Sequence, residues 1–178
     1  MIRIALEALQ RITHPRFFET ERGFQGEFQA NIRATIPATN QPDAIVEEEY
    51  QKCLGTHGIR RRPDVIVHVP TPPGQNCRLG NLAVFELKLA ARPAEARQDF
   101  KALDDIIDAM DYPFGAFINI ASKRTHADQY CGRFQGRFPE RVHFFAVWRE
   151  DGQTRVKHAC YNDTGSVEET IFPRPITP

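Results

Sequence analysis

Hydrophobic residues recur at three- and four-residue intervals in three parts of the chain, which is the spacing of one face of an α-helix. The pattern predicts helices over residues 2–12, about 18–34 and about 93–110. Prolines follow the first two segments and end them, because proline cannot continue a helix. Pro93 stands in the first turn of the third, where proline is tolerated.

Alternating or continuously hydrophobic segments, which are typical of strands, occupy much of the remaining chain. They predict strands over residues 44–52, 59–69, 81–89, 114–121, 141–150 and 154–161. The first three are expected to form an antiparallel meander, and Asp151-Gly152 predicts a tight hairpin between the last two. A polar helix is expected over residues 123–137, and the chain from residue 162 is expected to lie across the surface.

This order of elements predicts an α/β fold in which helices flank a central mixed β-sheet. A length of 178 residues fits a single domain. We expect one domain over residues 1–178, with a core over about 18–150. Residues 151–178 would add a C-terminal hairpin strand and a tail.

Composition and charge exclude some classes of protein and leave others open. The chain is 41% hydrophobic and 26% charged, and it has no hydrophobic run near the roughly 20 residues that span a bilayer. No membrane association is expected, and the charged N-terminal segment, which is unlike a signal peptide, favours a cytoplasmic location. Because the net charge is zero, it neither indicates nor excludes a nucleic-acid partner.

The four cysteines are far apart and form no Cys-x-x-Cys pair, which argues against a zinc ribbon and against a disulfide framework. Cys53 with His57, or His126 with Cys131, would supply only half of a metal site. We therefore expect reduced thiols.

The segment AVFELKLA, residues 83–90, places two charges in a strand that is otherwise apolar. Side chains alternate between the faces of a strand, so Glu86 and Lys88 share one face with Val84. An isolated buried charge costs several kcal/mol, so a polar group, a metal ion or a substrate should share that face. The alternative is an ion pair on a solvated face of the sheet.

An acidic residue upstream can meet this pair. Asp64 begins the alternating segment PDVIVHV, and pairing of the two strands through the 70–80 loop would set it opposite Glu86, with Cβ atoms about 5 Å apart. Two carboxylates this close repel each other unless a cation lies between them. Oxygen ligands of this kind suit Mg²⁺ or Mn²⁺, and Lys88 would stand close enough to hold an attacking water or to help deprotonate it.

Pro63-Asp64 followed by Glu86-Leu87-Lys88 resembles the motif of the PD-(D/E)XK nuclease superfamily, which has the restriction-endonuclease-like fold. The order of elements is similar to that family over about residues 18–150. The resemblance implies that Asp64, Glu86 and the backbone carbonyl of Leu87 bind a metal ion, and that Lys88 is the catalytic lysine. It also implies that the three-strand meander carries the site.

Many members of this family use a further acidic residue on the first core helix. Glu27 matches it best, as a ligand for a second metal ion or a water, and Glu21 is the competing choice. Some members place a polar residue on the helix after the lysine strand, where this chain has Gln98 and Lys101.

Basic residues near these segments are candidates for contact with phosphates. Arg60, Arg61 and Arg62 precede Asp64, although a solvated strand end explains them equally well. A second basic set surrounds the expected polar helix, where an ordinary polar surface is the alternative: Lys123, Arg124, Arg133, Arg137 and Arg141.

The function that the resemblance implies is a Mg²⁺-dependent hydrolase of phosphodiester bonds, an endonuclease acting on DNA rather than RNA. The reaction would be in-line attack by a metal-activated water, with Mn²⁺ able to replace Mg²⁺. A homodimer is one arrangement open to a small nuclease that cuts both strands. Two alternatives stay open: a non-catalytic nucleic-acid-binding or assembly subunit of the same fold, and a toxin-like or antiviral nuclease held in check by a partner.

Overall fold

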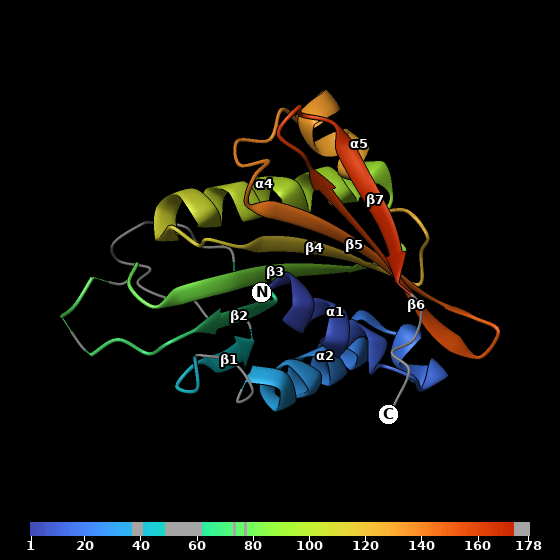
Figure 1. Ribbon diagram of the computed structural model, residues 1–178, viewed down its shortest axis with the longest axis horizontal. Helices are drawn as coiled ribbons and strands as arrows, with labels where there is room; N and C mark the ends of the chain where they lie inside the picture. Colours follow the sequence, from blue (N-terminus) through green and yellow to red (C-terminus); the bar gives the residue numbers. More distant parts are fainter. Residues whose placement is uncertain (37–40, 49–61, 73, 77, 173–178) are drawn as a thin grey trace.

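The computed structural model describes residues 1–36, 41–48, 62–72, 74–76 and 78–172, and they contain one seven-stranded mixed sheet (Figure 1). The strands are β1 (Ile45–Glu48), β2 (Val65–His68), β3 (Asn81–Leu89), β4 (Gly115–Ile120), β5 (Val142–Glu150), β6 (Gln153–Tyr161) and β7 (Val167–Phe172). They lie in the sheet in sequence order. β3, β4 and β5 pair in parallel, and the other neighbours pair antiparallel.

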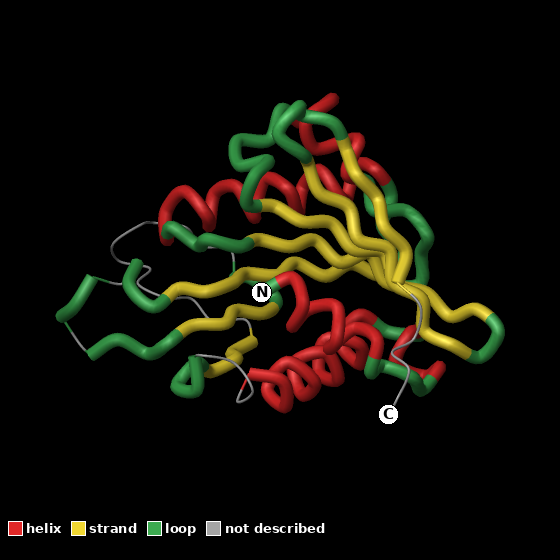
Figure 2. Tube along the Cα trace, in the orientation of Figure 1, coloured by secondary structure: helices red, strands yellow, loops and turns green. Residues whose placement is uncertain are grey.

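Helices cover both faces of this sheet, as the sequence predicts for an α/β fold (Figure 2). One face is covered by α1 (Ile2–Gln10), the short segment η1 (Pro15–Phe18) and α2 (Glu21–Thr35). The other is covered by α4 (Pro93–Met110), α5 (Ala127–Gln129) and η3 (Tyr130–Phe134). The Thr20 side chain caps α2 by accepting a hydrogen bond from the backbone N–H of Gly23 at 3.1 Å.

Each face of the sheet has its own hydrophobic core. On the α2 side, the ring of Phe28 packs edge-on against Phe85 at 5.2 Å. On the α4 side, Phe100 packs in the same way against Phe117, also at 5.2 Å. Because Phe85 lies in the first core and Val84 in the second, the alternation along β3 turns Glu86 toward the α4 side.

The polar helix expected over residues 123–137 is wrong in its extent, because only α5 and η3 form there. His126 adopts a left-handed conformation with φ 58°, which separates the loop after β4 from α5. Two glycines in the segment further weaken a continuous helix. The side chain of Tyr130 instead fixes the segment by donating a hydrogen bond to Asp104 at 2.5 Å.

The expectation for the chain from residue 162 is also wrong, since β7 pairs with β6 and extends the sheet. Asn162 organises the turn, with its side-chain oxygen accepting hydrogen bonds from the backbone N–H groups of Thr164 and Ser166, both at 3.0 Å. Gly165 provides the positive φ of 75° that the turn requires. Six residues of β7 then form the pairing.

Parts of two predicted strands lie outside the described residues. Of the strands expected over 44–52 and 59–69, the described portions are β1 and β2, while residues 49–61 are not described. In the part of the chain that is described, no helix is long and apolar enough to cross a membrane.

Candidate active site

The pairing of β2 with β3 determines where Asp64 lies. Val65 is opposite Phe85 and Ile66 is opposite Val84. Continuing this register by one residue sets Asp64 opposite Glu86, which is the arrangement that the strand spacing predicts.

The carboxylate of Asp64 is attached to the strand that carries Lys88. Its Oδ2 accepts a hydrogen bond from the backbone N–H of Leu87 at 2.7 Å, and its own backbone carbonyl accepts one from Gln25 Nε2 at 2.8 Å. The strand β2 begins only at Val65. The Asp64 side chain therefore accepts from the Leu87 N–H in place of a β2 backbone carbonyl, at the edge of β3 that faces β2. The carbonyl of Leu87 points to the same edge as its N–H, because the two groups of one strand residue share a side.

Glu21, in the first turn of α2, continues the same edge. Its Oε2 accepts a hydrogen bond from the backbone N–H of Leu89 at 3.1 Å and lies 3.4 Å from Nζ of Lys88. The side chains of Glu21 and Lys88 are each 37% exposed, so this ion pair is partly screened by solvent. Two carboxylates thus bind alternate N–H groups of β3 where β2 no longer pairs with it.

The site carries more negative than positive charge. Glu86 is 3% exposed, and Asp99 on α4 is 5% exposed. Burial raises the pKa of Asp64 to about 6, and the charges of Glu21 and Asp99 add to the rise. The hydrogen bond from the Leu87 N–H and the charge of Lys88 act in the opposite direction.

The same carboxylates keep the Lys88 side chain cationic. Burial alone would lower the pKa of Lys88, but the charges of Glu21 and Asp99, with the hydrogen bond to Glu21, raise it above its ordinary value. Lys88 is therefore an ammonium group at neutral pH. In this state it donates hydrogen bonds and offsets negative charge, and it does not act as a base.

Of the two acidic candidates on α2, the structure brings Glu21 and not Glu27 into contact with Lys88. Gln25 reaches Asp64 from the same helix, and Glu27, two residues later, is turned about 200° away. Its carboxylate accepts a hydrogen bond from Asn31 at 3.5 Å within α2. Glu27 as a ligand to a second metal ion therefore has no support from this geometry.

The candidates on α4 also differ from the residue that the structure brings to the site. Lys101 is exposed and forms an ion pair with Asp105 at 2.7 Å, and Gln98 is exposed as well. Asp99 instead faces the core and influences the site electrostatically. The sequence contains a signal for it, since Asp99 occupies a position on the same apolar stripe as Ala96 and Leu103.

Three of the five basic residues around the expected polar helix form ion pairs with acidic side chains of this chain. Arg137 lies 2.9 Å from Asp105, Arg141 lies 2.8 Å from Asp111, and Lys123 lies 2.5 Å from Glu150. These pairs favour the interpretation of an ordinary polar surface over that of a track for nucleic acid. The side chain of Arg133 lies outside the described portion of the chain.

The first basic set is described only in part. Arg60 and Arg61 lie outside the described residues, and Arg62 is exposed just before Asp64.

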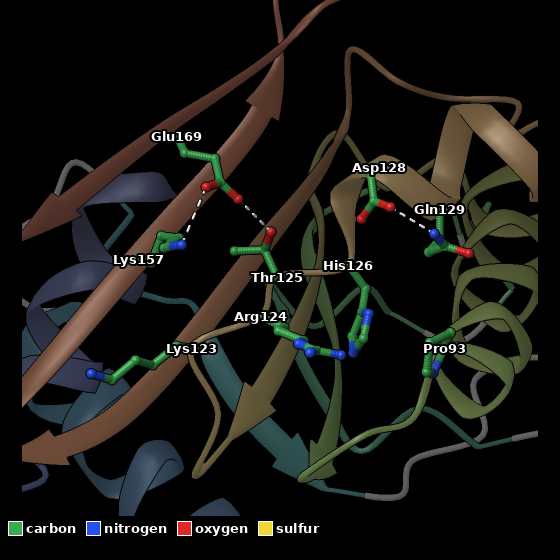
Figure 3. A pocket seen from close by; sticks show the side chains of 9 residues that line it. All are labelled: Pro93, Lys123, Arg124, Thr125, His126, Asp128, Gln129, Lys157 and Glu169. Atoms are coloured by element: carbon green, nitrogen blue, oxygen red, sulfur yellow. Dashed lines mark hydrogen bonds and ion pairs between the residues drawn. The ribbon is translucent and has the colours of Figure 1, made fainter.

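A pocket of about 340 Å³ lies where the loop after β4 meets the start of α4, β6 and β7, and several basic side chains line it (Figure 3). Within it, Nε2 of His126 donates a hydrogen bond to the carbonyl of Ala91 at 2.9 Å, three residues beyond Lys88. Figure 3 shows the guanidinium of Arg124 directed toward His126. Lys157 also lines the pocket and lies 3.2 Å from Glu169.

Comparisons of this chain with protein-family models, with curated protein sequences and with solved structures find no match. The chemistry of this site is therefore inferred from the arrangement of its charged side chains, which are Asp64, Glu86, Lys88 and Glu21.

Substitutions of Glu21 should distinguish the effect of its hydrogen bond with the Leu89 N–H from that of its ion pair with Lys88. Glu21→Gln keeps an oxygen that accepts from Leu89 and should change the free energy of unfolding by less than about 1 kcal/mol, because the lost ion pair is half-exposed. Glu21→Ala removes the acceptor and should cost about 1–2 kcal/mol more. Urea denaturation of the two variants side by side measures the difference. Equal stabilities would show that the hydrogen bond to Leu89 contributes nothing.

Proposed function

We propose that this chain is a Mg²⁺-dependent nuclease of the restriction-endonuclease-like type, which hydrolyses phosphodiester bonds of DNA. The observation that carries the proposal is the β2–β3 register, which continues to set Asp64 opposite Glu86 while Lys88 follows on the same face of β3. The antiparallel pairing of β1, β2 and β3 supports the meander expected of such a fold.

The donor atoms at this site fit a hard divalent cation. Asp64, Glu86 and the carbonyl of Leu87 offer oxygen atoms, which Mg²⁺ and Mn²⁺ prefer. The raised pKa of Asp64 shows that its ionised form is disfavoured where it lies, and a cation would relieve this. These three residues would hold the ion. Bound there, Mg²⁺ would lower the pKa of a coordinated water and offset charge on the phosphate.

The protein's own side chains would orient the reacting groups. The ammonium of Lys88 would donate a hydrogen bond to the attacking water or to a phosphate oxygen, and so stabilise negative charge as the new bond to phosphorus forms. Glu21 holds that ammonium from one side at 3.4 Å. Gln25 and the Leu87 N–H fix the backbone and the carboxylate of Asp64, so little reorganisation is needed during the reaction.

A contact to the substrate backbone would come from the exposed guanidinium of Arg62 at this edge. Arg62 is exposed just before Asp64 and is the basic side chain of the described residues that lies nearest to it in sequence. Guanidinium and ammonium groups bind phosphate oxygens of either DNA or RNA, so they supply affinity for the backbone and no sequence specificity.

A cleavage assay tests the proposal. The purified protein should cut supercoiled plasmid and linear duplex DNA with Mg²⁺ or Mn²⁺, and EDTA should stop the reaction. Single-stranded DNA and RNA of equal length, in parallel reactions, identify the preferred substrate. Retention of labelled DNA in a gel-shift assay, without cleavage in either metal, would contradict the nuclease and favour a non-catalytic nucleic-acid-binding subunit.

A further inference from the structure

Three side chains able to bind a transition metal meet on the other face of the sheet, on the β5–β6 hairpin. His143 belongs to β5, and His158 and Cys160 belong to β6. Phe145 and His158 are paired across the hairpin, and continuing that register by two residues sets His143 opposite Cys160. All three side chains share the face of Phe145, which lies in the α1–α2 core.

The potential ligand atoms are close together. Nδ1 of His143 lies 3.1 Å from Nε2 of His158 in a hydrogen bond between the rings, and metal binding would move the shared proton to the other nitrogen of its ring. One ligand atom from each of the two histidines and Cys160 lies within 4.8 Å of the others. The ring of Phe114 stacks on His143 with centroids 4.7 Å apart, and Phe145 lies 4.8 Å from His158. These aromatic contacts hold the imidazole rings in place.

The spacing matches a tetrahedral metal centre. With metal–nitrogen distances of about 2.0–2.1 Å, two imidazole nitrogens on Zn²⁺ lie roughly 3.3 Å apart. The two histidines are within a few tenths of an ångström of that separation. A sulfur ligand would stand about 3.6 Å from each nitrogen, so Cys160 needs to approach by no more than about an ångström.

The protonation states suit coordination. Burial and the neighbouring His158 lower the pKa of His143 to about 4, and burial lowers the pKa of His158. Both rings are therefore neutral at pH 7, which is the form that binds metals. Burial raises the pKa of the Cys160 thiol, so coordination would release one proton from sulfur to solvent as the metal–sulfur bond forms.

We propose that His143, His158 and Cys160 form a binding site for a borderline transition-metal ion, with Zn²⁺ as the best fit. Two nitrogens and one sulfur suit Zn²⁺, whereas the oxygen-lined site at Asp64 suits Mg²⁺. The two sites lie on opposite faces of the sheet and on different strands. Three protein ligands leave the fourth tetrahedral position to water or a small ligand.

Titration with Co²⁺, which replaces Zn²⁺ and absorbs visible light, tests the site. One Co²⁺ should bind with a thiolate-to-metal charge-transfer band, and added Zn²⁺ should abolish that band. Cys160→Ser should eliminate the band, and His143→Ala or His158→Ala should weaken binding at least about tenfold. Cys131→Ser is the matched control, because this cysteine is exposed, and it should leave binding unchanged. A band that survives Cys160→Ser would overturn the assignment.

A second measurement needs no variant and so does not depend on the variants folding. Alkylation of the native protein, read by mass spectrometry of the Cys160 and Cys131 peptides, should become slower at Cys160 when Zn²⁺ is present. The rate at Cys131 should not change. Equal rates at Cys160 with and without Zn²⁺ would contradict the site.

Discussion

Replacing Lys88 with alanine should reduce the rate of Mg²⁺-dependent DNA cleavage by about 10²- to 10³-fold, which is the range for loss of one group that stabilises charge in the transition state. The ammonium at this position is held by Glu21 at 3.4 Å, and the surrounding carboxylates keep it protonated. Alanine carries no charge, so it cannot stabilise the negative charge that develops on the phosphate in the transition state. Initial rates on plasmid DNA at saturating Mg²⁺ measure the effect.

The fold should survive this change. Lys88 is 37% exposed on its side chain, so its ion pair contributes less than about 1 kcal/mol to the free energy of unfolding. Arg3→Ala is the control, because it removes a similar ion pair with Glu7 on α1, and it should keep full activity. Wild-type rates in Lys88→Ala would refute the assignment of this residue.

Replacing Asp64 with asparagine should abolish cleavage and yet stabilise the metal-free protein at pH 8. The pKa of Asp64 is raised from 3.8 to about 6 in the folded state, so the folded state binds the proton more tightly than the unfolded chain does. The resulting stabilisation is present below pH 3.8 and is lost as the pH rises through about 6. Above that pH, the ionised group costs on the order of 3 kcal/mol.

Asparagine carries no charge and still offers an oxygen to the Leu87 N–H. Urea denaturation in EDTA should therefore show Asp64→Asn to be more stable than wild type at pH 8, and the difference should shrink toward pH 4. An equal loss of stability at both pH values would instead mean that Asp64 serves the fold as a hydrogen-bond acceptor. A residue that lowers stability while it enables chemistry is a common feature of active sites.

The arrangement of strands around this site follows from local pattern. Alternation assigns Glu86 and Lys88 to one face of β3, and the apolar residues beside them make this a buried strand. The position of Asp64 at the start of β2 then follows from the antiparallel register. Both are properties of short segments and their immediate partners, which the sequence encodes directly.

The contribution of the helices could not be predicted in the same way. Glu21 and Glu27 are both acidic and both lie on α2, and only the packing of that helix on the sheet decides which of them reaches Lys88. The sequence does not predict β7, because four of its six residues are exposed and the alternation that marks a strand is therefore weak. Its pairing with β6 depends on the Asn162 turn.

The cluster of His143, His158 and Cys160 could have been found from the sequence. A two-residue turn at Asp151-Gly152 sets Glu150 opposite Gln153, and counting outward from there sets His143 opposite Cys160. The spacing of cysteines along the chain does not reveal this cluster, because its ligands come from two strands and are close only across the hairpin.

The charged strand β7 has a consequence for how copies of this chain can associate. In the described part of the sheet it is one of the two outermost strands, and an outermost strand presents unpaired N–H and C=O groups that can template another chain. Glu168 places a negative charge there with which no basic side chain of the described residues forms an ion pair, whereas the charge of Glu169 is offset by Lys157 at 3.2 Å, and Ile171 is exposed beside them. The charge of Glu168 would oppose the pairing of two β7 strands side by side wherever it meets its copy, which protects this edge against aggregation. A functional dimer should therefore use a different surface.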